Sequence, residues 1–343
     1  MTRSLPALHR APPLGSRTPL VSVCIPTFDR GRYIEAAVSS AIAQTYERLE
    51  IIVIDDASRD DTVELVSACD DSRIRLERNH RRLGQNANRN RALLLARGEL
   101  IKFLDSDDLL DTGCVAEMVE IFADDPAVGL VSSRRRIAFE GPVTEASEAW
   151  LARFGDVHTN FAAIERVNDG RALLAEWLAA GLHDNWIGEP SAVMVRRDHL
   201  LASGGFSLYV RQRIDSDLWM RLLARSLVGF VDELLVTYRR GHQSEYVVNS
   251  RTRRDWLDRL WSLEGLAADL AIRQGYPELE RLLRDERTQA FRTAMRLGRL
   301  EDGRSVPVGP YLRYLKLRAL VRLGHSTALF ATLPHPAEPA HDA

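Results

Sequence analysis

The chain has 343 residues, enough for one large domain or two lobes. Charged residues make up 27% of it and its formal net charge is −2, so it has no general electrostatic reason to bind nucleic acid. No run of about 18 apolar residues is present, which argues against a membrane-spanning helix. The three cysteines show neither disulfide nor metal spacing, as is usual in a reducing cytosol, and we expect a cytoplasmic protein.

The first part of the chain reads as strand and helix units in alternation after an N-terminal tail. Residues 1–18 lack the apolar core of a signal peptide, and we predict a disordered tail. Helices are expected at 33–44, from 62 onward and up to 96. Strands are expected at 20–25, where Pro26 ends the run, and at 49–54, 74–76 and 100–104. Strands that are apolar throughout predict an α/β fold, with a parallel sheet covered on both faces.

Polar side chains follow three of these strands, at 26–29, 55–58 and 105–108. The carboxyl ends of parallel strands meet at one edge of a sheet, so the three exits are expected to converge. The last exit holds three carboxylates within four residues, and such a cluster calls for a cation or for hydrogen-bond donors. Hard oxygen ligands select Mg²⁺ or Mn²⁺. The alternative is a solvated turn in which Asp111 caps the next helix.

Four blocks of sequence in this part resemble the family 2 glycosyltransferases, which have the GT-A fold. Their order and spacing agree with the family from about Val21 to Leu110. The blocks are Val21–Phe28, Ile52–Ser58, Arg89–Asn90, and Arg97–Glu99 with the Asp-X-Asp segment Asp105–Asp108. The resemblance implies a Rossmann-like, mostly parallel sheet with helices on both faces.

The second half is harder to read from its pattern. We expect a loop or small insert at 140–156, a helix at 172–178, and strands at 190–196 and 234–238. Residues 213–222 resemble the acceptor-side block of the family, in which Glu-Asp usually opens a helix. Here Ile214 stands in place of the Glu, and Asp215 is retained. Residues 238–242 resemble the family's closing Tyr-Arg…His.

These observations divide the chain into four parts. After the tail at 1–18 come a nucleotide-sugar-binding half at 19–132, an acceptor-binding half at 133–245 and a helical C-terminal extension at 246–343. We expect the extension to pack on the catalytic domain. The alternative, weak peripheral membrane contact through a basic amphipathic segment at 312–323, is disfavoured because its charges do not fall on one helical face.

The resemblance implies an inverting transfer of a sugar from a nucleotide diphosphate to an acceptor hydroxyl, and it assigns roles to individual residues. Asp215 is the expected general base. Asp107 is the expected ligand of Mn²⁺ or Mg²⁺, and His242 is either a second ligand or a surface histidine. The residues expected to contact the nucleotide are Pro26, Thr27, Phe28, Asp55, Asp56, Arg89, Asp105 and Ser106.

Alternatives stay open for several of these assignments. Phe28 could belong to the core, Arg89 could form a structural salt bridge, and Asp215 could be a helix N-cap. UDP-sugars are favoured as donors because they are the commonest in the family. The acceptor could be a saccharide, a lipid-linked compound or a small-molecule hydroxyl, so membrane association is an alternative location. The alternative function is a catalytically inactive, GT-A-like nucleotide-sugar-binding protein. A dehydrogenase is excluded because no Gly-X-Gly-X-X-Gly follows the first strand.

Overall fold

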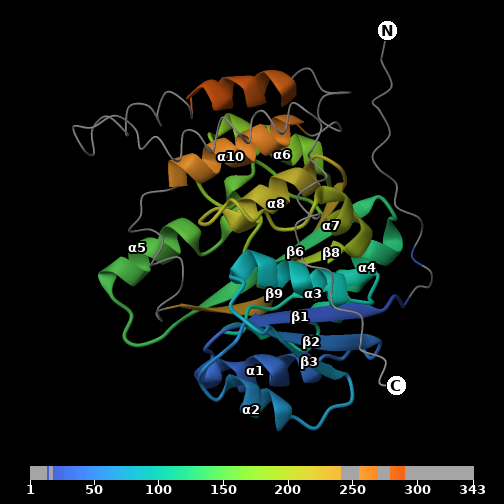
Figure 1. The fold of residues 1–343 in the computed structure, drawn as a ribbon. Helices are drawn as coiled ribbons and strands as arrows, with labels where there is room; N and C mark the ends of the chain where they lie inside the picture. The colour runs from blue at the N-terminus through green and yellow to red at the C-terminus, as the bar shows by residue number, and fades with distance from the viewer. Residues whose placement is uncertain (1–13, 15–17, 241–254, 269–278, 290–343) are drawn as a thin grey trace.

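A computed structural model describes residues 14, 18–240, 255–268 and 279–289 of the chain. A nine-stranded mixed sheet crosses the molecule, with helices on both faces (Figure 1). Eight strands follow one path in the order β3-β2-β1-β4-β8-β6-β9-β5, and β7 pairs with β9. This arrangement confirms the predicted α/β class. The predictions for His242, for segment 312–323 and for nearly all of the tail lie outside the described residues.

The first half of the sheet is parallel, as predicted. Its strands are β1 (Val21–Thr27), β2 (Leu49–Asp55), β3 (Ile74–Arg78) and β4 (Leu100–Phe103). The expectation that Pro26 ends the first strand was wrong, because β1 continues to Thr27. The carbonyl of Cys24 accepts from Leu104 on the β4 side, and that of Thr27 accepts from Asp56 on the β2 side. By alternation the nitrogen of Pro26 points to the β4 side, where β4 has already ended, so no ladder bond is lost.

The second half of the sheet is mixed. It contains β5 (Leu109–Leu110), β6 (Val128–Phe139), β7 (Val167–Asp169), β8 (Val193–Arg196) and β9 (Leu227–Arg240). Strand β8 runs antiparallel to both β4 and β6 and so joins the two halves. The strand expected at 190–196 begins only at Val193, after a 3₁₀ turn (η2, Pro190–Ala192), and the strand expected at 234–238 is much longer. Strand β6 was not predicted, because the arginines at 134–136 interrupt its apolar run.

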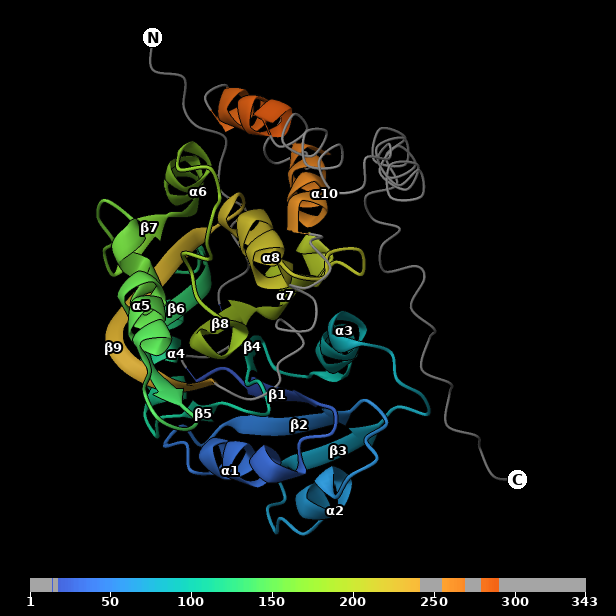
Figure 2. The same ribbon diagram turned by 90° about the vertical axis from the view of Figure 1, so that its left-hand side faces the viewer.

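Helices cover the two faces of the sheet (Figure 2). Each face has its own apolar core. Consecutive strand residues point to opposite faces, so Val23 packs in one core and Cys24 in the other. One core is closed by α1 (Gly31–Ile42), α2 (Thr62–Ser67) and α4 (Cys114–Asp124). The other is closed by α3 (Gln85–Leu95), α6 (Gly170–Ala179), α7 (Arg197–Ser203), α8 (Ile214–Leu223) and α10 (Asp255–Ala268).

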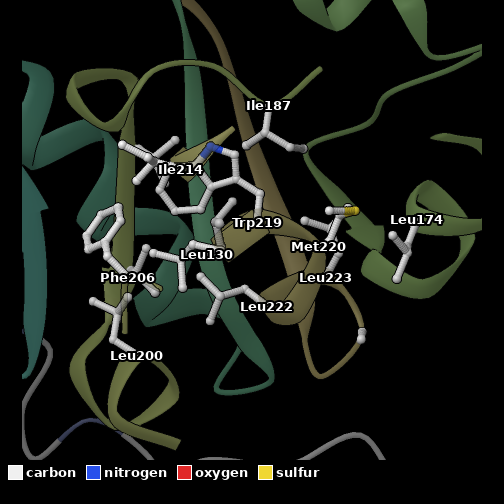
Figure 3. Close-up of a cluster of buried hydrophobic side chains, with 14 of the residues drawn as sticks. Leu130, Leu174, Ile187, Leu200, Phe206, Ile214, Trp219, Met220, Leu222 and Leu223 are labelled. Atoms are coloured by element: carbon white, nitrogen blue, oxygen red, sulfur yellow. The ribbon is translucent and has the colours of Figure 1, made fainter. Parts of the chain in front are cut away.

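Helix α8 is anchored by large apolar side chains. Figure 3 shows Ile214 and Trp219 of α8 in one cluster with Phe206 and Leu130. The Trp219 indole also donates a 2.9 Å hydrogen bond to the carbonyl of Gly188, which satisfies its buried N–H. The first turn of α8 is therefore fixed relative to the sheet.

Two features of the second half concern the predictions directly. Of the loop or small insert expected at 140–156, the loop was wrong, because α5 (Glu145–Phe154) forms there with Thr144 as its N-cap. Buried residues of α10 share the core that contains α8, which confirms for this helix that the extension packs on the catalytic domain.

No helix in the described ranges combines the length and hydropathy that a bilayer crossing requires.

Candidate functional site

The exit of β2 carries Asp55 and Asp56, and the structure gives both carboxylates partners within the protein. Asp55 is fully buried, accepts from the backbone of Ser58 at 3.1 Å and pairs with Arg78 at 3.3 Å. These contacts close the turn after the strand.

Asp56 is 2% exposed and accepts three hydrogen bonds. The donors are the amide of Asn79 at 2.7 Å and the backbone N–H groups of Leu83 and Gly84, each at 2.8 Å. Gly84 has φ +92°, a conformation that favours glycine, and directly precedes α3. Asp56 therefore shapes the loop that leads to α3.

The exit of β1 places Phe28 next to this loop. Phe28 is half-buried and belongs to neither apolar core, so its alternative as a core residue was wrong. The guanidinium of Arg82 lies 3.9 Å from the centre of its ring. The hydroxyl of Thr27 is buried and has no hydrogen-bond partner among the described residues. Pro26, Thr27 and Phe28 thus bring an aromatic face and an unsatisfied hydroxyl to the end of β1.

The exit of β4 gathers the carboxylates of the Asp-X-Asp segment. The side chain of Asp107 is 17% exposed and lies 3.6 Å from Arg30, and its backbone carbonyl accepts from Arg239. Ser106 is 5% exposed. The alternative, a solvated turn with Asp111 as cap, was wrong, because α4 has no side-chain cap and Asp111 instead pairs with Arg136 at 2.7 Å. The segment is therefore partly buried and held by contacts with distant residues.

A buried cluster that we did not predict lies beneath this segment. The hydroxyl of Ser191 donates to Asp108 at 2.6 Å and accepts from the backbone of Asp105 at 2.9 Å. Lys102, also fully buried, donates to the carbonyl of Ser191. Burial, followed by the charges of Asp107 and Asp105, raises the pKa of Asp108 well above its usual value. The two hydrogen bonds of Ser191 fix the loop that carries the Asp-X-Asp carboxylates.

Arg89 links Asp105, which follows β4, to Asp215 at the start of α8. It is 2% exposed, with its guanidinium 2.6 Å from Asp105 and 3.5 Å from Asp215. These two carboxylates raise the pKa of Arg89 against the opposing effect of burial. Arg89 therefore forms salt bridges with both carboxylates, which bring the β4 exit and α8 to one point, and its contact with a nucleotide stays a prediction.

Asp215 lies in the first turn of α8, and its alternative as the N-cap was wrong, because Arg213 holds that position. Its Oδ1 is buried and accepts no hydrogen bond from the described residues. Burial is the largest cause that raises the pKa of Asp215, to about 7, and Arg89 opposes the rise. A carboxyl with this pKa exchanges a proton readily at neutral pH.

Glu189 is a further carboxylate near Asp215 electrostatically, and the sequence analysis did not predict it. It pairs with Arg135, and its charge contributes to the raised pKa values of Asp215 and Tyr238. It lies between two fixed neighbours, since Gly188 is held by Trp219 and Ser191 by Asp108. The only sequence signal was an acidic residue directly before a predicted strand.

The residues present suit only one mode of binding a divalent cation, in which the protein supplies few ligands. The described residues contain no group of three histidine, cysteine, aspartate or glutamate side chains that could enclose a metal ion. Mg²⁺ and similar ions are commonly bound through one or two carboxylates, with substrate phosphates completing the shell. Asp107, partly exposed among like charges that raise the pKa of Asp108, fits that mode.

Comparison with known proteins shows the family to which the chain belongs. The sequence model for Glycosyl transferase family 2 matches residues 22–169. A protein of Mycobacterium tuberculosis, described as uncharacterized protein MT1568, is 39% identical over 251 residues, which cover 73% of this chain and 76% of the relative. This chain belongs to glycosyltransferase family 2. The predicted family and the prediction of a glycosyltransferase are confirmed.

A characterised relative of this glycosyltransferase is similar over a shorter span. WfaP of Escherichia coli, described as UDP-Glc:alpha-D-GlcNAc-diphosphoundecaprenol beta-1,3-glucosyltransferase, is 41% identical over 100 residues. That match covers 29% of the chain and 40% of WfaP. The chain therefore spans less than half the length of this relative.

Solved structures confirm the GT-A fold of the glycosyltransferase. Staphylococcus aureus TarS 1–349 in complex with UDP-GlcNAc has a TM-score of 0.60 at 14% identity, covering 90% of this chain and 88% of that one. The mannosyltransferase PcManGT of Pyrobaculum calidifontis, in complex with GDP-Man and Mn²⁺, has a TM-score of 0.53 at 19% identity. It covers 96% of this chain and 92% of that one.

Proposed function

We propose that this glycosyltransferase moves a sugar from a nucleotide-diphosphate donor to an acceptor hydroxyl with inversion at the anomeric carbon. The observation that carries the proposal is the Arg89 bridge, which brings Asp105 of the donor side and Asp215 of the acceptor side to one guanidinium. A transfer reaction needs both functions at one point, because the leaving group and the attacking hydroxyl lie on opposite sides of the same carbon.

The donor side would hold the nucleotide at the exits of β1, β2 and β4. The Phe28 ring offers a stacking face, and the unsatisfied hydroxyl of Thr27 fits a polar group of a ligand. Pro26, Ser106 and Asp105 border the same sheet edge. Asp55 and Asp56 would act mainly by fixing the surrounding turns, because most of their acceptor capacity is taken within the protein.

Asp107 would hold Mn²⁺ or Mg²⁺, with His242 as a proposed second ligand. When bound, such an ion offsets the negative charge that develops on a diphosphate leaving group. Arg30, 3.6 Å from Asp107, lies where it can contact the same phosphates. PcManGT, a protein of the same fold, is described in complex with Mn²⁺.

Asp215 would act as the general base. Its carboxylate takes the proton of the acceptor hydroxyl while that oxygen forms a bond to the anomeric carbon and the bond to the diphosphate oxygen breaks. A single base with attack from the face opposite the leaving group inverts the configuration. Such assistance is typically worth about 10²–10⁴-fold in rate.

A UDP-sugar is the donor that we favour, and a lipid-linked saccharide is the acceptor class. Support comes from WfaP, whose description names UDP-Glc and a diphosphoundecaprenol-linked sugar, and from TarS, described with UDP-GlcNAc. We place the enzyme in the cytoplasm, at the membrane surface where such an acceptor is held. The alternative function is a catalytically inactive nucleotide-sugar-binding protein. A turnover assay distinguishes the two, because only the enzyme transfers the sugar.

The test is a thermal-shift panel of UDP, GDP, dTDP and CDP, each with and without Mn²⁺, followed by a turnover assay on the matching nucleotide sugars. A ligand that binds only the native state raises the melting temperature by mass action. We expect a Mn²⁺-dependent shift with UDP and release of UDP from one UDP-sugar. Asp107→Asn should abolish the metal dependence, whereas the control Asp124→Asn, at an exposed surface pair, should leave it unchanged. Binding without turnover would favour the inactive binding protein.

A further inference from the structure

The segment 206–213 leads into α8 and is held from the donor side by α3. Asn90 of α3 exchanges two hydrogen bonds with the backbone of Phe206, each at 2.8 Å. Asn86, one turn earlier, donates to the carbonyl of Val210 at 2.8 Å and to that of Ser207. The helix that carries Arg89 therefore also holds the start of this segment.

The C-terminal extension holds the same segment from the other side. Asp258 of α10 is 2% exposed, and its Oδ2 accepts from the backbone N–H groups of Arg211 at 2.8 Å and Gln212 at 2.6 Å. The rings of Tyr209 and Trp261 meet edge to face with their centres 5.8 Å apart. One buried carboxylate thus satisfies two backbone donors immediately before α8.

Arg213 completes the fixation of the segment. It donates to the carbonyls of Leu182 and His183, each at 2.6 Å, and is the last residue before α8. The negative charge of Asp258 also lies near the N-terminal end of α8, where the partial positive charge of a helix favours an anion. The entry to α8 is therefore determined by side chains from three separate parts of the chain.

Packing between α10 and α8 makes Asp258 part of a rigid contact. Leu260 and Leu263 of α10 are buried in the core that contains Ile214 and Trp219 of α8. Figures 1 and 2 both show α10 beside α8. Helix α10 lies outside residues 22–169, the part that matches the family model.

We infer that Asp258 is a positioning residue for the transfer reaction. By holding the backbone of Arg211 and Gln212, it sets the start of α8 so that Asp215, in the first turn, lies opposite Arg89. On this inference the C-terminal extension contributes to the reaction by positioning the start of α8. The inference rests on the proposed function, because it assigns Asp258 an effect on the general base.

The test compares three variants with wild type on the nucleotide sugar that wild type turns over. Asp258→Ala removes both hydrogen bonds, and we expect kcat to fall at least 10-fold while the Kd for the nucleotide stays within 2-fold. Asp258→Asn keeps an oxygen that can accept both N–H groups, so kcat should recover to within 3-fold of wild type. Asp285→Asn, at an exposed carboxylate of the helical segment 279–289, is the matched control and should equal wild type.

Each outcome decides the inference. Equal kcat in wild type and Asp258→Ala, or a parallel loss of nucleotide affinity and kcat, would overturn it, because the second pattern is that of general structural damage. If Asp258→Ala does not fold, Asp258→Glu takes its place. Its carboxylate is displaced by the extra methylene, so a 5-fold or larger fall in kcat is expected, and wild-type kcat would overturn the inference. A wild type that turns over no nucleotide sugar contradicts the proposed function instead.

Discussion

Asp56 and Asp215 are two carboxylates of the candidate site that differ in how many hydrogen bonds they accept. Asp56, at the end of β2, accepts three hydrogen bonds from Asn79, Leu83 and Gly84. Oδ1 of Asp215, at the start of α8, is buried and accepts none from the described residues, with Arg89 at 3.5 Å as its charged neighbour. Burial raises the pKa of Asp215 to about 7, and the donors of Asp56 stabilise a loop.

The difference separates a carboxylate that fixes the local structure from one that is suited to accept a proton. A carboxylate that accepts several hydrogen bonds from the backbone and side chains around it fixes the conformation of that loop. A carboxylate that is desolvated and short of donors gains from taking a proton, which is what a general base must do. Asp56 therefore fits a role in fixing the loop before α3, whereas Asp215 fits the proposed role of general base.

The largest expected effect comes from Asp215→Asn. The amide cannot take the acceptor proton, so kcat should fall by about 10²–10⁴-fold. Nucleotide binding, measured by calorimetry, should be unchanged because Asp215 is not among the donor-side residues. Loss of binding in step with kcat would make Asp215 a structural residue and would remove the contrast with Asp56.

Asp56→Ala should act on stability first. It leaves the buried amide of Asn79 and two backbone N–H groups short of an acceptor, and we expect the free energy of unfolding in urea to fall by about 2–5 kcal/mol. Asp124→Asn, at an exposed carboxylate, should change it by less than about 0.5 kcal/mol. An unchanged unfolding free energy in Asp56→Ala would contradict the structural role.

Phe28→Ala should weaken nucleotide binding without loss of fold. Base stacking on an aromatic ring is worth about 1–3 kcal/mol, so Kd should rise by roughly 5- to 150-fold. Phe28→Tyr keeps the ring and serves as the control, with Kd near wild type. A normal Kd in Phe28→Ala would place the base away from the end of β1.

The pH profile gives the smallest effect and the finest test. The base works only when deprotonated, so kcat/KM should fall below the pKa of about 7 for Asp215, by about tenfold per pH unit, and level off above it. Since the folded carboxyl binds its proton more tightly than the unfolded one, this group favours the fold at lower pH and weakens it as pH rises toward 7. A flat profile between pH 5 and 8 would mean that a different group takes the proton.

The sequence by itself determined the parallel first half of the sheet. Apolar strands with polar exits are a local pattern, and it located β1, β2, β4 and the residues at their ends. Through short blocks of sequence, the family resemblance then indicated Asp107 as the expected metal ligand and Asp215 as the expected general base. The sheet order of the second half was not legible, because the arginines of β6 interrupt its apolar run and pair within the fold.

Only the tertiary structure decided which distant residues support the site. Ser191 reaches Asp108 across 83 positions of sequence, and Asp258 reaches Arg211 across 47. Glu189, which pairs with Arg135, was not among the residues to which the resemblance gave a role. A hydrogen bond or ion pair of this kind depends on how two elements pack, and periodicity along the chain records only which face of an element is buried.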